Sequence, residues 1–597
     1  TGKAYTFRVL VEIIAVLWLI LALRDRSYMP KKSWVIGAVA LFTLIVGVAD
    51  AFGVEPLRSI WSNYERMEGF VWIAHLFIYF IATSSLIGGG KGGTHLASTA
   101  EKERTILWAI FAHFALLISV IVGIHGLGQL SGQPAGFRID SYLGNSTYLG
   151  VYALVHFFLA LMFWIRNIYE IGDARVKHAK QKVETILQLI GYTLVGAFNL
   201  LVMYHTGTRG SVVGLACGLL FVSLIIALRE KSHKIIRGTG IAILVLVVAT
   251  VITLGASKNS DFVKKNSLLA RFSALATFDV KGVLSNEGHA RTLLWGIAYN
   301  GFKENPILGW GQDNFGYVFT KHYDPQMYGQ ETWFDRTHNV IFDWLISAGL
   351  LGLLSYLGLF AAVIWSLWRK SDFALGEKAT ITGLLIAYFV HNLFVFDNLS
   401  SYIVFFSLLA YIHSRVGAAP VIPVRTGEVS AQARETQQTL TNYLYVPLIV
   451  IIGAGVLWGV NIPGYRANKE LISAMTACRY KKFDDAKKIF ASAIADSAYG
   501  GRSEIREQLL SCASSIANDA NAAPSVKVEW IEMGLVSAEE QVTTTPNDTR
   551  SYVAAASYAS AIGNQPLAQK YWEGAIKTAP KKQQPMISLA LLYINTK

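Results

Sequence analysis

The sequence predicts an all-α fold, in which a polytopic bundle of transmembrane helices is followed by a soluble α-helical repeat region. Hydrophobic residues make up 53% of the 597-residue chain and charged residues only 16%, with a mean hydropathy of +0.39. A soluble protein of this size carries about a quarter charged residues, so much of this chain is expected to face lipid. The region after residue 465 differs, because it is rich in alanine, mixed in charge and helical in its periodicity.

Twelve apolar runs are long enough to cross a bilayer. Some contain glycine or one polar group, which membrane helices tolerate. The runs divide the chain into transmembrane helices over 1–255, a long external loop over 256–339, transmembrane helices over 340–461 and a soluble domain over 462–597. A polar, proline-containing cytoplasmic linker is expected near 416–440. The runs lie near 8–23, 34–52, 70–87, 105–124, 146–165, 185–204, 211–228, 236–255, 340–368, 379–396, 400–414 and 443–461.

The distribution of basic residues between the loops predicts the orientation of the bundle. The loops on one side carry 22 Lys and Arg residues, whereas the short loops on the other side carry 4. Cytoplasmic loops are the ones enriched in Lys and Arg, so the first set is expected in the cytoplasm. The segment 256–339 and the region from about 462 then lie outside. Residues 1–7 also begin outside, so a further span is expected upstream of Thr1.

Several local patterns are set aside. The net charge of +13 lies largely in the cytoplasmic loops and does not indicate nucleic-acid binding. The glycine-rich run 88–93 fits a dinucleotide-binding pattern by letter, but it lies between two spans with no strand before it. Three cysteines are too few for a disulfide framework, and Cys478 and Cys512 could pair or remain free thiols. The chain has no paired aspartates two residues apart, which argues against a nucleotide-sugar donor held by metal.

The C-terminal region contains two stretches with the helix–turn–helix pattern of tetratricopeptide repeats. Such repeats stack into curved surfaces that usually bind peptides or proteins, although an ordinary helical bundle would give a similar pattern. We therefore expect this external region to be repeat-like and to offer a surface for a protein partner. The pattern residues are Ala477, Tyr480, Phe483, Ala486, Phe490 and Ala493 in one stretch, and Tyr558, Gly563, Ala568, Trp572, Ala575 and Pro580 in the other.

The long loop 256–339 carries the most informative motifs. Arg291 lies in the run His-Ala-Arg-Thr-Leu-Leu-Trp, and residues 305–315 read Asn-Pro-Ile-Leu-Gly-Trp-Gly-Gln-Asp-Asn-Phe. The loop ends in Phe-Asp-Arg-Thr-His-Asn at 334–339 and leads into a span with Gly-Leu-Leu-Gly-Leu-Leu at 349–354. A second arginine motif, Gly-Thr-Arg-Gly-Ser at 207–211, lies at an outer helix end.

In this order, the motifs resemble the O-antigen ligase and polymerase superfamily, and the resemblance covers roughly residues 60–415. It implies an integral membrane glycosyltransferase that uses an undecaprenyl-diphosphate-linked glycan, without a metal or other cofactor. It also implies that a histidine of the external loop and arginines at the membrane edge are essential. In this sequence, those positions are His338, Arg209 and Arg291.

The chemistry of such a reaction explains why these residue types are needed. Arginine is permanently charged and can donate two parallel hydrogen bonds to phosphate oxygens, so Arg209 and Arg291 are candidates to hold the diphosphate. The alternative is that they reach to the lipid phosphates. A neutral histidine is the usual base for a hydroxyl acceptor, and His338 is the candidate, with Asp335 and Asn339 orienting it. The alternative for His338 is a structural role, in which this loop histidine only satisfies the start of the following helix.

Further residues are assigned to donor binding. Arg66 is an outer-loop arginine that either contributes to the diphosphate site or pairs only with Glu65 or Glu68, and Arg336 is next but one to the histidine. Gly309 and Gly311 are expected to form a tight turn that brings two amides to the site. Aromatic side chains of the loop could stack on sugars or on the lipid interface. These two amides are Gln312 and Asn314, and these aromatic residues are Trp310, Trp333 and Tyr328.

Several functions remain open from the sequence. The glycan could be transferred to a lipid core by a ligase, to another repeat unit by a polymerase, or to Ser or Thr of a protein by an O-oligosaccharyltransferase. The repeat-like region favours a protein partner or acceptor. A transporter of lipid-linked sugar is the non-enzyme alternative, although its spans would usually be broken near the membrane midplane. A non-enzymatic anchor would not require twelve spans. By resemblance, the expected location is a bacterial inner or plasma membrane.

Overall fold

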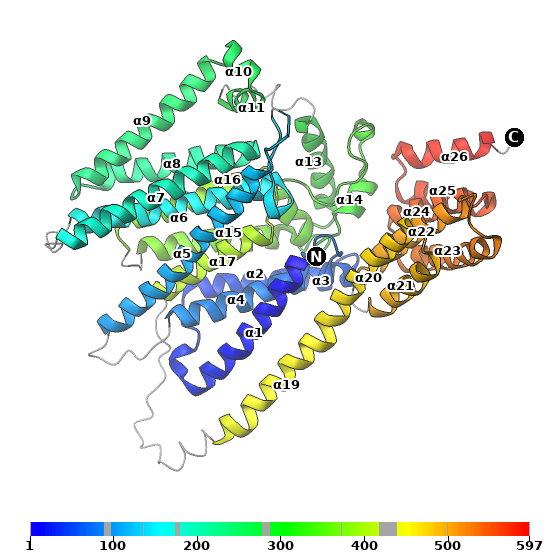
Figure 1. Ribbon diagram of the computed structural model, residues 1–597, viewed down its shortest axis with the longest axis horizontal. Helices are drawn as coiled ribbons and strands as arrows, with labels where there is room; N and C mark the ends of the chain where they lie inside the picture. The colour runs from blue at the N-terminus through cyan, green and yellow to red at the C-terminus, as the bar shows by residue number, and fades with distance from the viewer. Residues whose placement is uncertain are drawn as a thin grey trace.

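The computed structural model describes residues 2–88, 97–134, 136–172, 179–276, 287–369, 371, 373–416, 439–497 and 500–595. Within these residues, 81% of the structure is helical and there is no strand, so the all-α prediction is confirmed. Most of the glycine-rich run 88–93 and of the linker 416–440 lies outside the described residues. Figure 1 shows a bundle of long helices at one side and a group of shorter helices at the other.

Eleven of the described helices are long and apolar enough to cross a membrane, and the chain is a multi-pass membrane protein. Ten of them lie in the bundle. The last is one continuous helical stretch, Thr441–Arg479, which links the bundle to the C-terminal helices. The ten are α1 (Gly2–Arg24), α2 (Trp34–Ala51), α4 (Phe70–Gly88), α5 (Ala97–Gly128), α6 (Ser146–Gly172), α7 (Ala179–Thr206), α8 (Arg209–Arg229), α9 (Lys234–Ala256), α15 (Val340–Arg369) and α17 (Leu399–Val416).

One of the twelve predicted spans, 379–396, corresponds to a helix that differs from the prediction. This helix, α16 (Leu375–Asn392), ends four residues earlier and is not among the apolar helices that qualify as spans. It carries Glu377, Lys378 and His391, and most of its residues are buried against α6, α8 and α15. A helix enclosed by other helices does not need an apolar surface on every side, which explains its polar composition.

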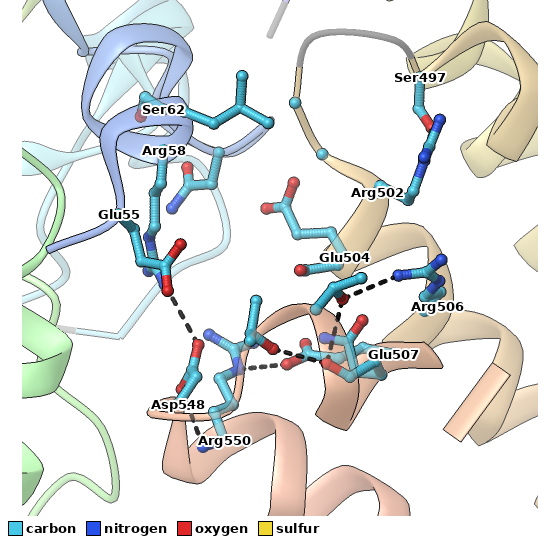
Figure 2. A pocket seen from close by; sticks show the side chains of 18 of the residues that line it. Glu55, Arg58, Ser62, Ser497, Arg502, Glu504, Arg506, Glu507, Asp548 and Arg550 are labelled. Atoms are coloured by element: carbon cyan, nitrogen blue, oxygen red, sulfur yellow. Dashed lines mark hydrogen bonds and ion pairs between the residues drawn. The ribbon is translucent and has the colours of Figure 1, made fainter. Parts of the chain in front are cut away.

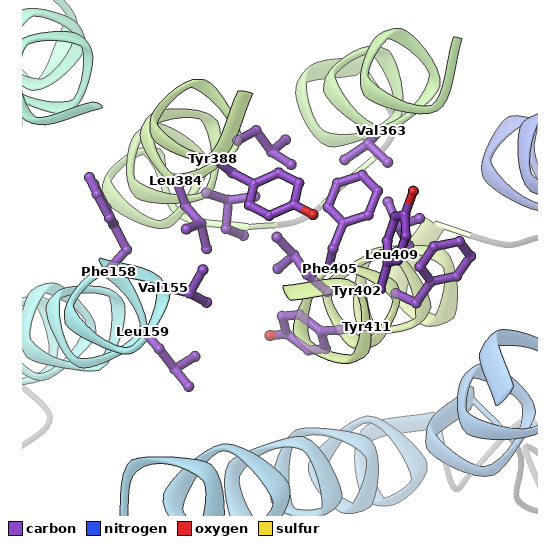
Figure 3. Close-up of a cluster of buried hydrophobic side chains, with 14 of the residues drawn as sticks. Val155, Phe158, Leu159, Val363, Leu384, Tyr388, Tyr402, Phe405, Leu409 and Tyr411 are labelled. Carbon is purple, nitrogen blue, oxygen red and sulfur yellow. The ribbon is translucent and has the colours of Figure 1, made fainter. Parts of the chain in front are cut away.

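The interior of the bundle is built largely from aromatic and aliphatic side chains of α6, α15, α16 and α17 (Figure 3). Tyr388 of α16 stacks on Phe405 of α17, with ring centroids 5.1 Å apart. By contrast, α5 and α9 expose large apolar side chains, and Leu246 is 65% exposed. Such exposure is unfavourable in water but is expected of a surface that faces lipid.

Between α9 and α15 the chain forms a small helical subdomain at one end of the bundle (Figure 1). Its core contains Leu294, Phe315 and Phe319, and Ile346 of α15 joins it to the bundle. The part of the segment from α13 onward therefore packs on α15 and is not an extended loop, whereas α10 packs against α11, and α11 packs against α9 and α8. The described elements of the segment are α10 (Asp261–Lys265), α11 (Ser267–Ala276), α13 (Glu287–Glu304), α14 (Phe315–Lys321) and η3 (Pro325–Met327).

A break in α15 holds this subdomain in place. Ala348 and Gly349 depart from helical geometry, and Gly349 has a φ of 64°. The carbonyl of Ile346, freed by the break, accepts a hydrogen bond from the backbone N–H of Trp310 at 2.7 Å. Gly309 and Gly311 also have positive φ, as the predicted tight turn requires. The Pro-Ile-Leu-Gly-Trp-Gly segment thus continues the hydrogen bonding that α15 interrupts.

The C-terminal helices, called here the tail, begin with α20 and pack as consecutive pairs (Figure 1). Cys478 of α20 and Cys512 of α22 form a disulfide with a Cα–Cα distance of 6.2 Å. The small and aromatic residues of the repeat-like pattern include Phe490 and Trp572, which are buried in the tail core. Assignment of the tail to tetratricopeptide repeats stays a prediction. The elements of the tail are α20 (Ile462–Arg479), α21 (Phe483–Asp496), α22 (Arg502–Ala517), α23 (Pro524–Thr544), α24 (Thr549–Ala561), α25 (Gln565–Thr578) and α26 (Gln583–Asn595), and they follow η4 (Thr441–Tyr445), α19 (Val446–Val456) and η5 (Leu457–Asn461) of the last candidate span.

Candidate functional site

Several segments that are distant in the sequence meet at the subdomain end of the bundle. Asp50, at the end of α2, accepts a hydrogen bond from the backbone N–H of Gln312 at 2.6 Å. Asn339 donates from its side chain to the carbonyl of Leu393, in the turn between α16 and α17, at 3.1 Å. These contacts join the helix ends that the charge distribution places on the side opposite the basic loops. Polar and charged side chains converge there.

Arg66 and Asp335 form the first ion pair of this site. The Nε and Nη2 atoms of Arg66 donate to the two carboxylate oxygens of Asp335, and Nη1 donates to the hydroxyl of Tyr148 at 3.2 Å. The guanidinium holds the pKa of Asp335 below its usual value, although burial opposes this. Asp335 was expected to orient His338, but its carboxylate is bonded to Arg66. Arg66 was expected to pair with Glu65 or Glu68 if it served structure alone, and neither is its bonded partner.

Arg336 forms the second ion pair, with two acidic partners. Its Nη2 lies 2.8 Å from a carboxylate oxygen of Asp343, in the first turn of α15, and its Nη1 lies 3.2 Å from Glu68. Burial raises the pKa of Glu68 to about 7, while Arg336 and Arg66 act in the opposite direction. Both arginines therefore tie the segment before α15 to the segment before α4.

Phe396 is the common neighbour of these groups. The guanidinium carbons of Arg66 and Arg336 lie 4.8 Å and 4.6 Å from the centroid of its ring. The imidazole of His338 lies 5.4 Å from the same centroid. A cation over an aromatic face is attracted by the ring quadrupole, most strongly where water is excluded. Phe396 thus packs against both arginines and the histidine, and its ring helps to keep the two positive charges close to His338.

The backbone at His338 adopts a conformation that is uncommon for a residue with a side chain. Its φ is 54°, in the left-handed region. The flanking side chains support this turn, since the hydroxyl of Thr337 donates to the carbonyl of Asn339 at 2.9 Å. The side-chain oxygen of Asn339 accepts from the N–H of Ile341 at 2.9 Å and so caps α15. Strain of this kind persists where the surroundings fix it, and it often occurs at functional sites.

Burial and positive charge keep the imidazole of His338 neutral. The pKa of His338 is lowered to about 4, first by burial and then by Arg291, whose charge acts more strongly on it than those of Arg66 and Arg336. The carboxylate of Asp335 acts in the opposite direction and raises this pKa, but its effect is smaller than the effects of burial and of Arg291. Arg291 lies on α13, so the structure brings two of the three residues named by the sequence motifs into electrostatic contact. A histidine that is neutral near pH 7 can accept a proton there.

Arg209 lies at the start of α8, close to the same turn that contacts Asn339. The next residue, Gly210, packs so closely on this turn that a Cβ would lie 3.2 Å from both the carbonyl oxygen of His391 and the Cβ of Phe394. Thr208 precedes the helix as its N-cap residue. The start of a helix carries a partial positive charge and unpaired N–H groups, which suits an anion such as a phosphate. Gly210, next to Arg209, and Asn339, next to His338, therefore contact the same turn between α16 and α17.

The two amides proposed for donor binding, Gln312 and Asn314, donate hydrogen bonds to neighbouring segments of the chain. The side chain of Gln312 donates to the carbonyl of Glu68 at 3.2 Å. Asn314 is fully buried and donates to the hydroxyl of Ser59 and to the carbonyl of Trp310, each at 2.8 Å. Asn314 is thus enclosed by neighbouring segments of the chain. The assignment of both amides to donor binding stays a prediction.

A separate cavity of about 260 Å³ lies between the tail and the segment 55–65 (Figure 2). It is lined by polar and charged side chains, some of which form ion pairs with one another. Arg58 lies 3.3 Å from Asp548 of the tail, and Arg550 lies 2.8 Å from Glu507. The cavity lies beside the segment that carries Arg66, and the Arg58–Asp548 pair holds the tail against the bundle, whereas the Arg550–Glu507 pair lies within the tail.

Sequence reasoning missed several members of the site. Tyr148, Asp343 and Phe396 complete the arginine contacts, and Tyr148 and Phe396 lie far in sequence from the arginines that they contact. The signal that could have found Asp343 is an acidic residue in the first turn of a long apolar helix, which costs free energy unless it has a partner. No local pattern marks Phe396 among the many phenylalanines of the chain.

Comparison with protein families agrees with the geometry. A family model described as O-antigen ligase matches residues 194–357. Over these residues, the chain is similar to O-antigen ligases. The matched segment runs from within α7 to the middle of α15, and it contains Arg209, Arg291 and His338. No curated protein matches the chain.

Proposed function

We propose that this protein transfers a preassembled glycan from undecaprenyl diphosphate to an acceptor hydroxyl on the outer face of a bacterial inner or plasma membrane. The observation that carries the proposal is the position of His338. It is neutral, is held by a strained turn, and lies among three arginines at one end of a membrane bundle. The similarity to O-antigen ligases supports a membrane enzyme of this general class.

Four arginines, three near His338 and one at the start of α8, fall into two groups according to their contacts. Arg66 and Arg336 are engaged by carboxylates, so they shape the site and contribute a positive field. Arg209 and Arg291 are the residues that we assign to the diphosphate, the first at a helix start and the second beside His338. A diphosphate leaving group gains negative charge as its bond to carbon breaks, so fixed positive charges lower the barrier.

The proposed reaction is one displacement. The acceptor oxygen attacks the anomeric carbon while its proton passes to an imidazole nitrogen of His338. The bond between the anomeric carbon and the diphosphate oxygen breaks, and undecaprenyl diphosphate leaves with the bonding electrons. A single displacement inverts the configuration at the anomeric carbon. The reaction as proposed requires no metal, because arginines supply the positive charge.

The orientation and the acceptor are also part of the proposal. The excess of Lys and Arg in one set of loops supports a cytoplasmic location for those loops and an outer location for the site. The disulfide of the tail supports the same orientation, because disulfides persist in oxidising compartments. The tail contacts the site segments directly, which favours a protein acceptor or partner over a simple lipid acceptor.

The test is transfer by the purified protein in detergent, with undecaprenyl-diphosphate-linked glycan, a chelator, and candidate lipid, glycan and protein acceptors. We expect one acceptor to gain the mass of the glycan, and His338→Ala to lower the rate by about 100- to 10,000-fold. His289→Ala is the matched control, because that histidine lies in the same subdomain and is exposed. Absence of transfer to every acceptor, combined with movement of the donor across vesicles, would favour a transporter instead.

A further inference from the structure

A lysine of the tail is buried inside the subdomain that carries His338. Lys582 lies between α25 and α26 and is only 2% exposed. Its Nζ donates to the carbonyl of Thr332 at 2.7 Å. Lysine is rarely buried so completely, because its charge loses the solvation of water. Burial accordingly lowers the pKa of Lys582 to about 8.

Three aromatic rings surround the ammonium and offset part of this loss. The Nζ atom lies 4.3 Å from the ring centroid of Trp333, 4.7 Å from that of Tyr323 and 5.5 Å from that of Phe319. We call these three rings the lysine cage. Cation–π contacts of this kind are strongest when the cation is desolvated, as here. The arrangement is a specific receptor for one organic cation, and the tail supplies that cation.

The lysine cage is linked to His338 by direct packing. Phe334 follows Trp333 in the chain, and its ring lies 5.6 Å from that of Phe319 and 6.0 Å from the imidazole of His338. Asp335, the next residue, holds Arg66. A shift of the cage would therefore displace both the ring against His338 and the ion pair beside it.

The tail also holds the other half of the site. The backbone N–H of Tyr64 donates to Glu504 of α22 at 2.7 Å, two residues before Arg66. Gln583, next to Lys582, donates to the carbonyl of Pro325 at 3.0 Å. The tail thus contacts the Arg66 segment and the His338 segment separately, and the two segments meet in the Arg66–Asp335 pair.

We infer that Lys582 is a positioning residue, which enters the lysine cage to fix the segment 325–338 and so places His338 for the transfer proposed above. The inference rests on the proposed function for its effect on rate, and on contacts alone for its effect on the segment. It gives the tail a direct part in the site. Removing Lys582 loosens the support of His338 without removing any group that contacts the substrates.

The test compares Lys582→Met, which keeps the unbranched shape and most of the length of the side chain but not its charge, with Lys582→Arg, Lys582→Ala and wild type. Lys581→Ala is the matched control, because this neighbour is exposed. The first measurement, hydrogen–deuterium exchange of residues 325–338, does not depend on the reaction. We expect faster exchange in Lys582→Met and Lys582→Ala, and unchanged exchange in Lys581→Ala.

The second measurement is the rate of glycan transfer. We expect Lys582→Met to lower kcat by about 10- to 100-fold, the loss typical of a misplaced catalytic group, with the KM for the donor changed by no more than about 3-fold. Lys582→Arg should restore most of kcat. Propylammonium, which supplies the missing part of the side chain, should partly rescue Lys582→Ala, whereas propanol should not. Rescue distinguishes occupation of the cage from a general loss of stability.

The outcomes are separable. Unchanged exchange in Lys582→Met, or unchanged kcat with faster exchange, would overturn the inference. A rise in KM alone, with kcat preserved, would also overturn it, because the lysine would then act on binding. Should Lys582→Met fail to fold, Lys582→Ala with and without propylammonium decides the question. If wild type transfers no glycan but the exchange result holds, the proposed function fails while the hold of Lys582 on the segment stands.

Discussion

Arg66 and Asp335, 269 positions apart in the chain, form a two-pronged ion pair that closes the site at the end of the bundle. The pair joins the segment before α4 to the segment before α15. Each of these segments is also held by the tail, through Tyr64 and Lys582 respectively. The pair is therefore the point at which the bundle, the subdomain and the tail act on one another.

We expect Arg66→Ala and Asp335→Ala to impair transfer by similar amounts, and the double variant to be little worse than either. The reason is that each single change breaks the same ion pair and leaves its other member unpaired in a partly buried position. A double-mutant cycle on kcat/KM should give a coupling of about 1–3 kcal/mol. Glu65→Ala is the control, since Glu65 is exposed. Additive losses would show that the two residues act independently.

The rate of transfer should depend on pH through His338, with an acid limb well below pH 6.5. Only the neutral imidazole accepts a proton, and its pKa is lowered to about 4, so the neutral form persists as the pH falls from 7 to about 5. Arg291→Ala removes a charge that lowers this pKa, so the acid limb should move to higher pH. The measurement is kcat/KM against pH.

Arg291→Lys serves as the control for this experiment, because it keeps the charge. Its acid limb should stay near that of wild type even if its rate falls through weaker phosphate binding. A wild-type limb near pH 6.5, or one that Arg291→Ala does not move, would contradict the placement of Arg291 beside His338.

The fold class followed from the sequence because apolar run length and loop charge reflect the bilayer directly. The exception was α16, whose Glu377 and His391 are tolerated because neighbouring helices enclose them. That enclosure is a property of the assembled bundle. The sequence therefore gave no basis for separating a lipid-facing helix from an enclosed one.

The sequence motifs indicated some residues of the candidate site, but not the contacts between segments that only the assembled fold brings together. His338 and Arg291 stand in recognisable motifs, and the structure brings them into electrostatic contact. Asp335 was linked to His338 because it lies three residues away, but its carboxylate meets Arg66, which lies far away in the chain. Sequence proximity indicates neighbours along a helix, and it fails where the backbone turns sharply, as it does at the left-handed His338.

The break in α15 should be intolerant of side chains. Gly349 has positive φ, and a Cβ there would collide with the backbone of Ile307. We expect Gly349→Ala to lower the free energy of unfolding by about 1–3 kcal/mol or more and to reduce transfer, because the subdomain would lose its close packing against the break in α15. Thermal unfolding in detergent and the transfer assay measure both effects.

Gly358, in the regular part of the same helix, is the matched control. A Cβ at that position meets nothing within 4 Å, so Gly358→Ala should leave both stability and transfer close to wild type. Equal tolerance at the two positions would mean that the break in α15 is not required.

The disulfide of the tail can be tested by counting reactive thiols, and it should stabilise the tail. Cys478 and Cys512 are paired and Cys217 is free, so the unfolded, non-reduced protein should show one reactive thiol and the reduced protein three. The bridge spans 34 positions, so Cys478→Ser with Cys512→Ser should lower the free energy of unfolding of the tail by about 3–4 kcal/mol on the chain-entropy model. Cys217→Ser, in α8, should leave the sensitivity to reductant unchanged. Three reactive thiols before reduction would exclude the bridge and remove one argument for an outer location of the tail. A single thiol would support that location, because a stable structural disulfide is rare in a reducing cytoplasm.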